Sequence, residues 1–264
     1  MSSTAKTRDG VEIVYEIHGD KNAPKRIALV HSLAMERGFW DGVVAKLAGK
    51  AAILTFDCRG HGQSGKPKGP YTFEQFADDL ADVMTHVGWD KATVAGCSMG
   101  GCVALAFAIR HPQRTKSLGL IDTTAWYGAD APKAWGERAD AAVNKGLSSL
   151  ADFQLTRWFS DAYRTSGNAV VKKALAVFLA NEIPAYADTC RMLGAADLRD
   201  KLGTINMPTR IIVGEEDYAT TVAMAQAMNA GIKGSTMMVL DKARHLTPLE
   251  VPEKIAPELE KLLG

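Results

Sequence analysis

One short segment, VAGCSMGG at 94–101, places a serine among small residues in a way that suits nucleophilic chemistry. Ser98 lies between Gly96 and Gly100, after an apolar run typical of a strand and before a run typical of a helix. A G-x-S-x-G pattern in this context predicts a sharp turn that lifts the hydroxyl clear of the sheet, beside free N–H groups of the helix. The alternative is a serine that only caps the helix. The segment matches neither a Walker loop nor a dinucleotide-binding loop.

A serine hydroxyl is a weak nucleophile and needs a general base. His245 is the favoured base, because it follows the last predicted strand in VLDKARHLTPLEVP and precedes the final helix. A loop at the carboxyl edge of a parallel sheet can bring it over the serine. The remaining histidines are predicted to be structural, although the glycine-rich loop around His61 leaves a functional role open there; they are His18, His31, His61, His86 and His111.

The third group should be a carboxylate that orients the imidazole and stabilises its cation. Asp217 is the first choice, because it ends IIVGEED and reaches furthest into the loop after that strand. Glu215 and Glu216 are close rivals, and Asp122, after the preceding core strand, is another. The chain order serine, aspartate, histidine is the order found in α/β-hydrolases.

Two backbone N–H groups are needed to stabilise the oxyanion of an acyl-transfer reaction. Met99, directly after the serine, is predicted to supply one of them, and Leu33 in the loop HSLAM the other. Together these groups favour acyl transfer to water that needs no metal and no cofactor.

Apolar runs that alternate with amphipathic ones predict how these residues are positioned. Strand-like runs of this kind alternate with helical segments in a mainly parallel α/β sheet; the runs are VEIVYEIHGD, RIALVH, AAILTFD, ATVAG, KSLGLID, TRIIVGEED and TMMVLD. A helix is predicted over 72–87, with Thr72 as its cap and Gln75 at the capping-box position. Another is predicted over 253–263.

The alternation stops after Asp122. Residues 125–202 contain no convincing strand and read as helical pieces over 132–145, 149–159, 168–181 and 184–193. We therefore predict a helical cap at 125–202, inserted into a core made of residues 1–124 and 203–264.

Composition excludes several classes of protein. The chain has 264 residues with 47% hydrophobic and 23% charged residues, which is typical of a globular protein, and its net charge of +1 gives no sign of nucleic-acid binding. No apolar run reaches the roughly 18 residues of a membrane span, and the N-terminus lacks a secretory signal. A soluble, cytoplasmic protein is expected. The four scattered cysteines predict buried, reduced thiols rather than disulfides or a zinc site.

These motifs together resemble the α/β-hydrolase superfamily over nearly the whole chain; they are HSLAM, FDCRGHGQS, GCSMGG, IIVGEED and ARHLTPLEVPE. Within it, GPYTFEQFADDL, LADFQLTRWFSDAY and EIPAYADTCRMLGAADLRDKL are most similar to bacterial 3-oxoadipate enol-lactonases of aromatic catabolism. The resemblance implies an eight-stranded, mainly parallel sheet flanked by helices, with a helical cap inserted after the sixth strand. It also implies Ser98 as nucleophile, Asp217 as acid and His245 as base, in the hydrolysis of a small enol-lactone.

The sequence departs from the family pattern near the proposed site. Glycine is expected in place of Ala34, and proline in place of Tyr218. His245 is followed by LTPLE, where an LSN-type ending is expected.

The implied substrate is a small anionic lactone, which would be met by a cation and by aromatic walls in the cap. Trp135 and Arg138 are the predicted binding residues, because they are three apart on one predicted helix and share a face. Arg157 and Trp158 are further candidates. The alternative to substrate binding is a structural role for each of these residues, in which the tryptophan packs within the cap or the arginine is a solvated surface charge.

Other functions remain open at this point. On the same fold they are a carboxylesterase or other lactonase, a carbon–carbon bond hydrolase, and a cofactor-free perhydrolase. From another class comes a non-catalytic ligand receptor, against which an intact triad argues. The sequence leaves the oligomeric state undetermined.

Overall fold

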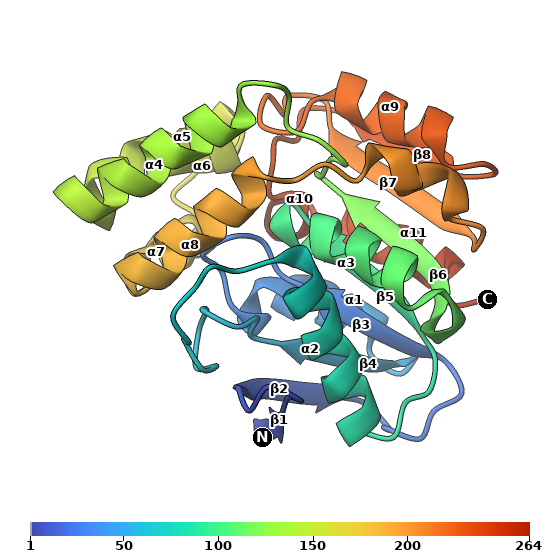
Figure 1. The fold of residues 1–264 in the computed structure, drawn as a ribbon. Coiled ribbons are helices and arrows are strands. Elements are labelled where there is room, and N and C mark those ends of the chain that lie inside the picture. Colours follow the sequence, from blue (N-terminus) through green and yellow to red (C-terminus); the bar gives the residue numbers. More distant parts are fainter. Residues whose placement is uncertain (1) are drawn as a thin grey trace.

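The computed structural model describes residues 2–264, and within them the chain forms one eight-stranded sheet (Figure 1). The strand order is β1-β2-β4-β3-β5-β6-β7-β8; β3 to β8 are parallel, while β1 and β2 run antiparallel at one edge. The strands are Ser3–Lys6 (β1), Glu12–His18 (β2), Arg26–Val30 (β3), Ala52–Phe56 (β4), Ala92–Cys97 (β5), Thr115–Ile121 (β6), Thr209–Gly214 (β7) and Thr236–Leu240 (β8). The predicted α/β class and mainly parallel sheet are confirmed.

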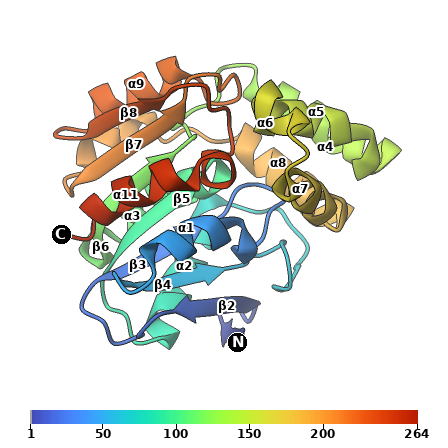
Figure 2. The same ribbon diagram turned by 180° about the vertical axis from the view of Figure 1, so that it is seen from behind.

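Helices cover both faces of this sheet. Figures 1 and 2 show α2, α3 and α9 on one face and α1 and α11 on the other. The helices are Asp41–Leu47 (α1), Phe73–His86 (α2), Met99–Arg110 (α3), Ala131–Lys145 (α4), Ala151–Trp158 (α5), Asp161–Thr165 (α6), Ala169–Leu179 (α7), Ile183–Gly194 (α8), Val222–Gly231 (α9), Thr247–Glu250 (α10) and Pro252–Lys261 (α11). Short 3₁₀ turns occupy Arg37–Trp40, Pro112–Arg114, Leu147–Leu150 and Arg199–Thr204.

The central strands are apolar along their whole length because both of their faces are covered. Every residue of β4 and of β5 is buried. The edge strand β1, with the sequence STAK, buries only Ala5 and so lacks a continuous apolar run. That is why the seven strand-like runs in the sequence did not include it.

The long helix α2 begins as predicted. The Thr72 hydroxyl accepts from the Gln75 N–H, and the Gln75 side chain accepts from the Thr72 N–H. This capping box satisfies two backbone donors that the first turn would otherwise leave free.

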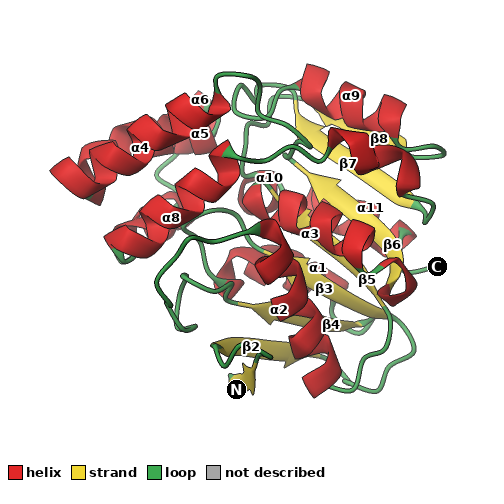
Figure 3. Cartoon of the chain, viewed as in Figure 1, coloured by secondary structure: helices red, strands yellow, loops and turns green. Residues whose placement is uncertain are grey.

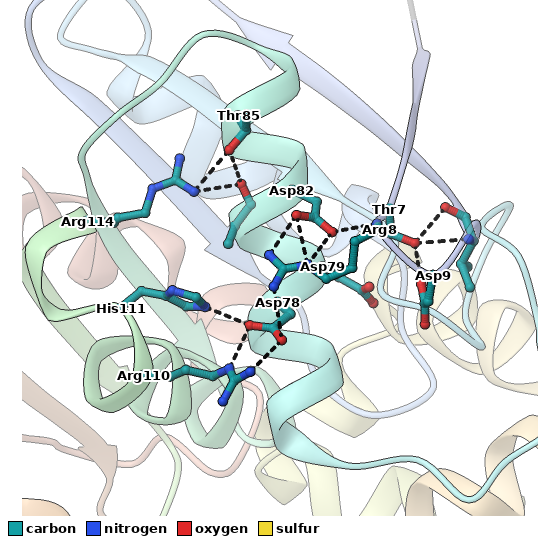
Figure 4. A network of polar contacts seen from close by, with 12 residues as sticks. Thr7, Arg8, Asp9, Asp78, Asp79, Asp82, Thr85, Arg110, His111 and Arg114 are labelled. Atoms are coloured by element: carbon teal, nitrogen blue, oxygen red, sulfur yellow. Dashed lines mark hydrogen bonds and ion pairs between the residues drawn. The ribbon is translucent and has the colours of Figure 1, made fainter.

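Charged side chains tie α2 to its neighbours, as Figure 4 shows. Asp78 accepts hydrogen bonds from Arg110 at the end of α3 and lies 2.8 Å from His111 Nε2, and one turn on Asp82 binds Arg8 from the β1–β2 turn. These contacts give His111 the structural role predicted for it. Arg110 also holds the pKa of Asp78 at about 2, below its usual range.

Along the chain, helices α4 to α8 come after β6 and before β7. In space they project to one side of the sheet (Figure 3). This confirms a helical insertion after the sixth strand. The predicted pieces correspond to α4, α5, α7 and α8, while α6, of five residues, was missed because it is shorter than two turns. In the same region, Trp126 and Asp197 pair as an isolated antiparallel bridge where the insertion leaves and rejoins the core.

Two predictions from composition can be compared with this fold. All four cysteines are buried and free, as predicted. Among residues 2–264, no helix has the length and apolar character needed to cross a membrane.

Candidate active site

The turn between β5 and α3 holds Ser98 in an unusual backbone conformation, with φ +55° and ψ −119°. The flanking glycines explain how the chain reaches it. A Cβ on Gly96 would lie 2.0 Å from the Gly100 oxygen, and one on Gly100 would lie 2.1 Å from the Val30 oxygen. Only glycine fits at either position, so the strained turn is built into the sequence.

The structure brings the three predicted residues into one hydrogen-bonded line. His245 Nε2 lies 2.9 Å from Ser98 Oγ, and its Nδ1 lies 2.8 Å from Asp217 Oδ2. Each residue follows a different strand, since Ser98 comes after β5, Asp217 after β7 and His245 after β8. All three side chains are buried, although Ser98 keeps 7% exposure toward a cavity. A base within hydrogen-bonding distance of a hydroxyl, oriented by a carboxylate, is the arrangement that nucleophilic catalysis requires.

Asp217 is held by its own loop as well as by His245. Its Oδ1 accepts from the N–H groups of Ala219 and Thr220, and its Oδ2 accepts from the Thr220 hydroxyl at 2.8 Å. Burial alone would raise the pKa of Asp217, but the charge of His245 and these hydrogen bonds outweigh it and lower the pKa. The carboxylate therefore stays ionised and keeps the Nδ1 proton of the imidazole in place.

The rival acids occupy other positions. Glu215 accepts from the Lys242 N–H, and Glu216 pairs with Arg244. Asp122 is fully buried at the end of β6, with no hydrogen bond to His245. None of the three contacts the imidazole.

Asp122 has a different place in the site. Its Oδ1 accepts from the N–H of Gly214, three residues before Asp217, and its Oδ2 accepts from the N–H and hydroxyl of Thr247, two residues after His245. The Cys97 thiol, next to Ser98, lies 3.7 Å from the same Oδ2. One carboxylate thus joins all three triad-bearing segments. Burial, followed by the charge of Asp217, raises its pKa well above the usual value.

The two predicted oxyanion donors, Leu33 and Met99, have backbone N–H groups with no partner elsewhere in the described chain. Leu33 borders the cavity above Ser98, and Met99 is the first residue of α3, so its N–H has no partner within the helix. In residues 2–264, neither N–H makes a hydrogen bond to another loop or turn. No other group of the described chain takes up either N–H, and their role as oxyanion donors stays a prediction.

Ala34 occupies a turn that favours glycine. The Met35 N–H donates to the Ser32 oxygen, and this closes a four-residue turn whose third residue, Ala34, has φ +59°. This left-handed conformation explains why glycine is expected there and shows that the fold tolerates alanine. The Ala34 carbonyl accepts a hydrogen bond from the Asn181 side chain, so the cap contacts the loop HSLAM at 31–35, called the oxyanion loop below.

The cap closes over Ser98. The space directly above the serine is only about 10 Å³, and it is bordered by Tyr127, Trp135, Arg138, Arg157 and Trp158 together with His245. A larger cavity of about 420 Å³ lies beyond and shares the first four of these side chains. Trp135 and Arg138 therefore line the space at Ser98, and their binding of a substrate stays a prediction. A substrate must displace some of these side chains to reach the nucleophile.

The remaining loop histidines form a separate pair beneath the oxyanion loop. His31 Nε2 accepts from the Cys58 N–H, and His61 Nδ1 lies 3.0 Å from the Arg59 oxygen. Their rings meet edge to face at 5.2 Å. Burial lowers the pKa of His31 to about 4, and burial, followed by the cost of placing a second positive charge beside His31, lowers the pKa of His61 to about 3, so both rings are neutral at pH 7. Neither ring lines the cavity over Ser98.

Sequence reasoning missed several groups at this site. The turn after Asp217 could have been found, because Asp side chains commonly accept a hydrogen bond from the backbone N–H two residues on, as Asp217 does from Ala219. Tyr127 gave no such signal. Trp158, a candidate for its side chain, also contributes its backbone oxygen, which accepts from the N–H groups of His245 and Leu246 at 3.1 and 3.0 Å. No sequence pattern predicts a long-range backbone contact of this kind.

Comparison with known proteins places this geometry in a family. The family model described as alpha/beta hydrolase fold matches residues 25–252. A protein of Acinetobacter baylyi named 3-oxoadipate enol-lactonase 1 is 34% identical over 247 residues, covering 94% of this chain and 91% of the relative.

Solved structures agree with this assignment. The enol-lactonase from Burkholderia xenovorans LB400 superposes with a TM-score of 0.94 at 32% identity, covering 99% of each chain. A thermophilic esterase from Thermogutta terrifontis, solved with malate bound, superposes with a TM-score of 0.92 at 27% identity, covering 100% of this chain and 98% of the other. The strand order, the helical insertion after β6 and this likeness over nearly the whole length show that the protein belongs to the α/β-hydrolase fold family and is a hydrolase.

Proposed function

We propose that this hydrolase opens a small enol-lactone that carries a carboxylate, converting 3-oxoadipate enol-lactone to 3-oxoadipate through an acyl-enzyme on Ser98. The observation that carries the proposal is the line of contacts from Ser98 Oγ through His245 to Asp217, at 2.9 and 2.8 Å. The relatives from A. baylyi and B. xenovorans support the choice of substrate.

In the first half-reaction, His245 Nε2 takes the Ser98 proton as Oγ attacks the lactone carbonyl. The oxyanion that forms is stabilised by the N–H groups of Leu33 and Met99. When the tetrahedral intermediate collapses, the ring C–O bond breaks and the enol oxygen takes the proton back from His245. The enol then becomes the ketone, and the acyl chain remains bound to Ser98.

In the second half-reaction a water molecule replaces the serine. His245 removes a proton from the water as it attacks the acyl carbonyl, and the same two N–H groups stabilise the oxyanion. Collapse of this intermediate returns the proton to Ser98 Oγ and releases a carboxylic acid. The net reaction adds one water to the lactone and forms a keto dicarboxylate.

The pocket suits an anionic substrate. Trp135 and Arg138 border the space above Ser98, and we assign them to substrate binding. The guanidinium of Arg138 lies 4.7 Å from the centre of the Trp135 ring, so the cation is held against an aromatic face. The malate bound to the T. terrifontis esterase is a small dicarboxylate, which supports the same chemical class of ligand here.

The test is a Ser98→Ala variant assayed against the enol-lactone and a neutral p-nitrophenyl ester. Loss of both activities by about 10⁴-fold or more is expected, because the residual rate would come from the oxyanion donors and binding alone. A Ser149→Ala variant, which alters an exposed serine in the cap, serves as the control and should match the wild type. A fluorophosphonate should label Ser98 in the wild type. Near wild-type rates in Ser98→Ala would overturn the proposal.

A substrate panel separates the enol-lactone from other reactions of the fold. Activity on simple esters without activity on the enol-lactone would identify a carboxylesterase. Cleavage of a 2,6-diketo acid would identify a carbon–carbon bond hydrolase, and peroxide-dependent halogenation a perhydrolase. An unlabelled Ser98 with no turnover of any substrate would favour a ligand receptor.

A further inference from the structure

Two arginines of the cap border the space above Ser98, and neither has an acidic partner. Within residues 2–264, Arg138 and Arg157 form no ion pair with any carboxylate, although both also line the larger outer cavity. Two neighbouring cations in a partly enclosed space repel each other. An anion bound between Arg138 and Arg157 would relieve the repulsion between their charges. Because both residues border the space above Ser98, that anion would lie beside the proposed nucleophile.

Arg138 is already committed to the protein. Its Nε donates to the Tyr186 hydroxyl at 2.8 Å and its Nη2 to the Gln154 side chain at 2.7 Å. Its guanidinium also lies against the rings of Trp135 and Phe153. The protein therefore fixes the position of this positive charge and takes up part of its N–H donors.

Arg157, unlike Arg138, has no hydrogen-bond partner in the described chain. Within that part of the chain its one cation–π contact is with Phe153, whose ring centre lies 5.7 Å from the guanidinium carbon. Burial, followed by the charge of Arg138, lowers its pKa to about 10. Its guanidinium is therefore still charged at neutral pH, and all five of its N–H donors are available to a ligand.

We propose that Arg157 is the specificity-determining residue that binds a second, carboxylate end of the acyl substrate, so that the enzyme selects carboxylate-bearing acyl compounds over neutral ones and binds small dicarboxylates. Arg138 remains a substrate-binding residue, which adds its positive charge from the side and forms part of the pocket wall with Trp135. This inference rests on the proposed function and deepens it, because it assigns the anion to a different residue from the one that the sequence favoured.

The backbone next to Arg157 is tied to the loop that carries His245. Trp158, its neighbour, accepts hydrogen bonds from the N–H groups of His245 and Leu246 through its carbonyl. The residue that binds the anion and the residue that moves the proton are thus attached to one hydrogen-bonded unit. A substrate whose carboxylate reaches Arg157 is held in a set position relative to Ser98 and His245.

The test compares two esters of equal chain length that differ in the remote carboxylate, monomethyl glutarate and methyl pentanoate, with hydrolysis followed by acid release. In Arg157→Gln, the KM for monomethyl glutarate should rise about 10- to 100-fold, which is the loss expected for a charge-assisted hydrogen bond, while kcat/KM for methyl pentanoate stays within about twofold. Arg157→Lys should recover part of the loss, because it keeps the charge but not the planar donor set.

Arg191→Gln is the matched control, because Arg191 is an exposed cap arginine, paired with Asp140 and Asp188, that lines neither cavity. It removes the same charge from the cap and should leave the kinetic constants for both esters within about twofold. An equal change in Arg191→Gln and Arg157→Gln would show general electrostatic attraction and overturn the proposal.

Binding of glutarate gives a readout that does not depend on turnover. Calorimetry should detect glutarate binding to the wild type and to Ser98→Ala, and affinity should fall at least tenfold in Arg157→Gln. Absence of binding to the wild type, or equal binding to Arg157→Gln, would overturn the inference even if ester hydrolysis and Ser98 labelling are intact. Loss of labelling and of all hydrolysis would instead overturn the proposed function.

Discussion

The carbonyl oxygen of Trp158, at the end of cap helix α5, accepts the N–H of His245 at 3.1 Å. The cap and the loop that carries the imidazole are therefore one hydrogen-bonded unit at this side of the site. Arg244 extends the attachment, because its guanidinium donates to the Thr156 oxygen and pairs with Asp161. A movement of α5 away from the core would have to break these hydrogen bonds or carry the His245 loop with it.

Glu250 is expected to control the position of His245 through this attachment. Its buried carboxylate accepts from the N–H and hydroxyl of Ser160 in the cap and from the N–H of Arg244. In Glu250→Gln the amide group cannot accept all of these donors. We expect a loss of about 1–3 kcal/mol in the free energy of unfolding and a lower kcat with little change in KM for a neutral ester.

The effect of Glu250→Gln on kcat should be measured per active site, by titration with a fluorophosphonate well below the melting temperature. Glu253→Gln, which changes an exposed glutamate three residues away, should behave as the wild type. An unchanged kcat per titrated site would show that Glu250 only stabilises the fold.

Asp122 should contribute more to stability than to the chemical step. Removing its carboxylate in Asp122→Ala leaves the N–H groups of Gly214 and Thr247 buried without acceptors. We expect unfolding in urea to show a loss of about 2–5 kcal/mol. Asp122→Asn should lose less, because one oxygen remains and the Thr247 hydroxyl can accept from the amide. Equal losses in the two variants would contradict this assignment of hydrogen bonds.

Gly96 and Gly100, two residues on either side of Ser98, should not tolerate a side chain, whereas Gly136 in the cap should. Gly96→Ala and Gly100→Ala each place a Cβ within about 2 Å of a backbone oxygen, so both should fail to fold or lose more than about 4 kcal/mol. Gly136 lies in the middle of α4 with open space around it, and Gly136→Ala should raise the free energy of unfolding by about 1 kcal/mol. Thermal unfolding of the three variants checks both expectations.

Acid should destabilise the fold through His31 and His61. Their pKa values of about 4 and about 3 in the folded state lie below the ordinary value of 6.5, so the unfolded chain binds more protons in between. The stabilising contribution of the neutral rings is complete above pH 6.5 and is lost progressively as the pH falls toward the folded pKa values, by several kcal/mol in total. Urea unfolding at pH 7 and at pH 5 measures the difference.

A pair of variants assigns this acid sensitivity. His61→Asn keeps a donor for the Arg59 oxygen but cannot titrate, so its stability should change less between pH 7 and pH 5 than that of the wild type. His86→Asn, at an exposed position on α2, should retain the wild-type difference. If His61→Asn loses as much stability as the wild type over this range, other groups cause the acid sensitivity.

Short-range patterns in the sequence were enough to predict the class of fold and the three residues that form one hydrogen-bonded line at Ser98. The turn at Ser98 depends on Gly96 and Gly100, whose need for absent side chains can be read locally. Apolar periodicity predicted the covered strands and the helix α2, and the end of each strand located Asp217 and His245. These features depend on residues that are close in sequence, or on the rule that reactive loops follow parallel strands.

Contacts between distant segments were decided only by the tertiary structure. Asp122 and Asp217 both follow a core strand, but they have different partners. Asp122 accepts from backbone N–H groups, whereas Asp217 contacts the His245 imidazole. The tertiary structure also leaves Arg157 without an acidic partner while Tyr186 and Gln154 occupy Arg138. Burial and hydrogen-bond partners depend on how the cap packs against the core, and residue type and spacing do not specify that packing. For this reason the sequence by itself determined which residues could carry nucleophilic chemistry at Ser98, whereas the folded cap decides which of its arginines is left without a hydrogen-bond partner.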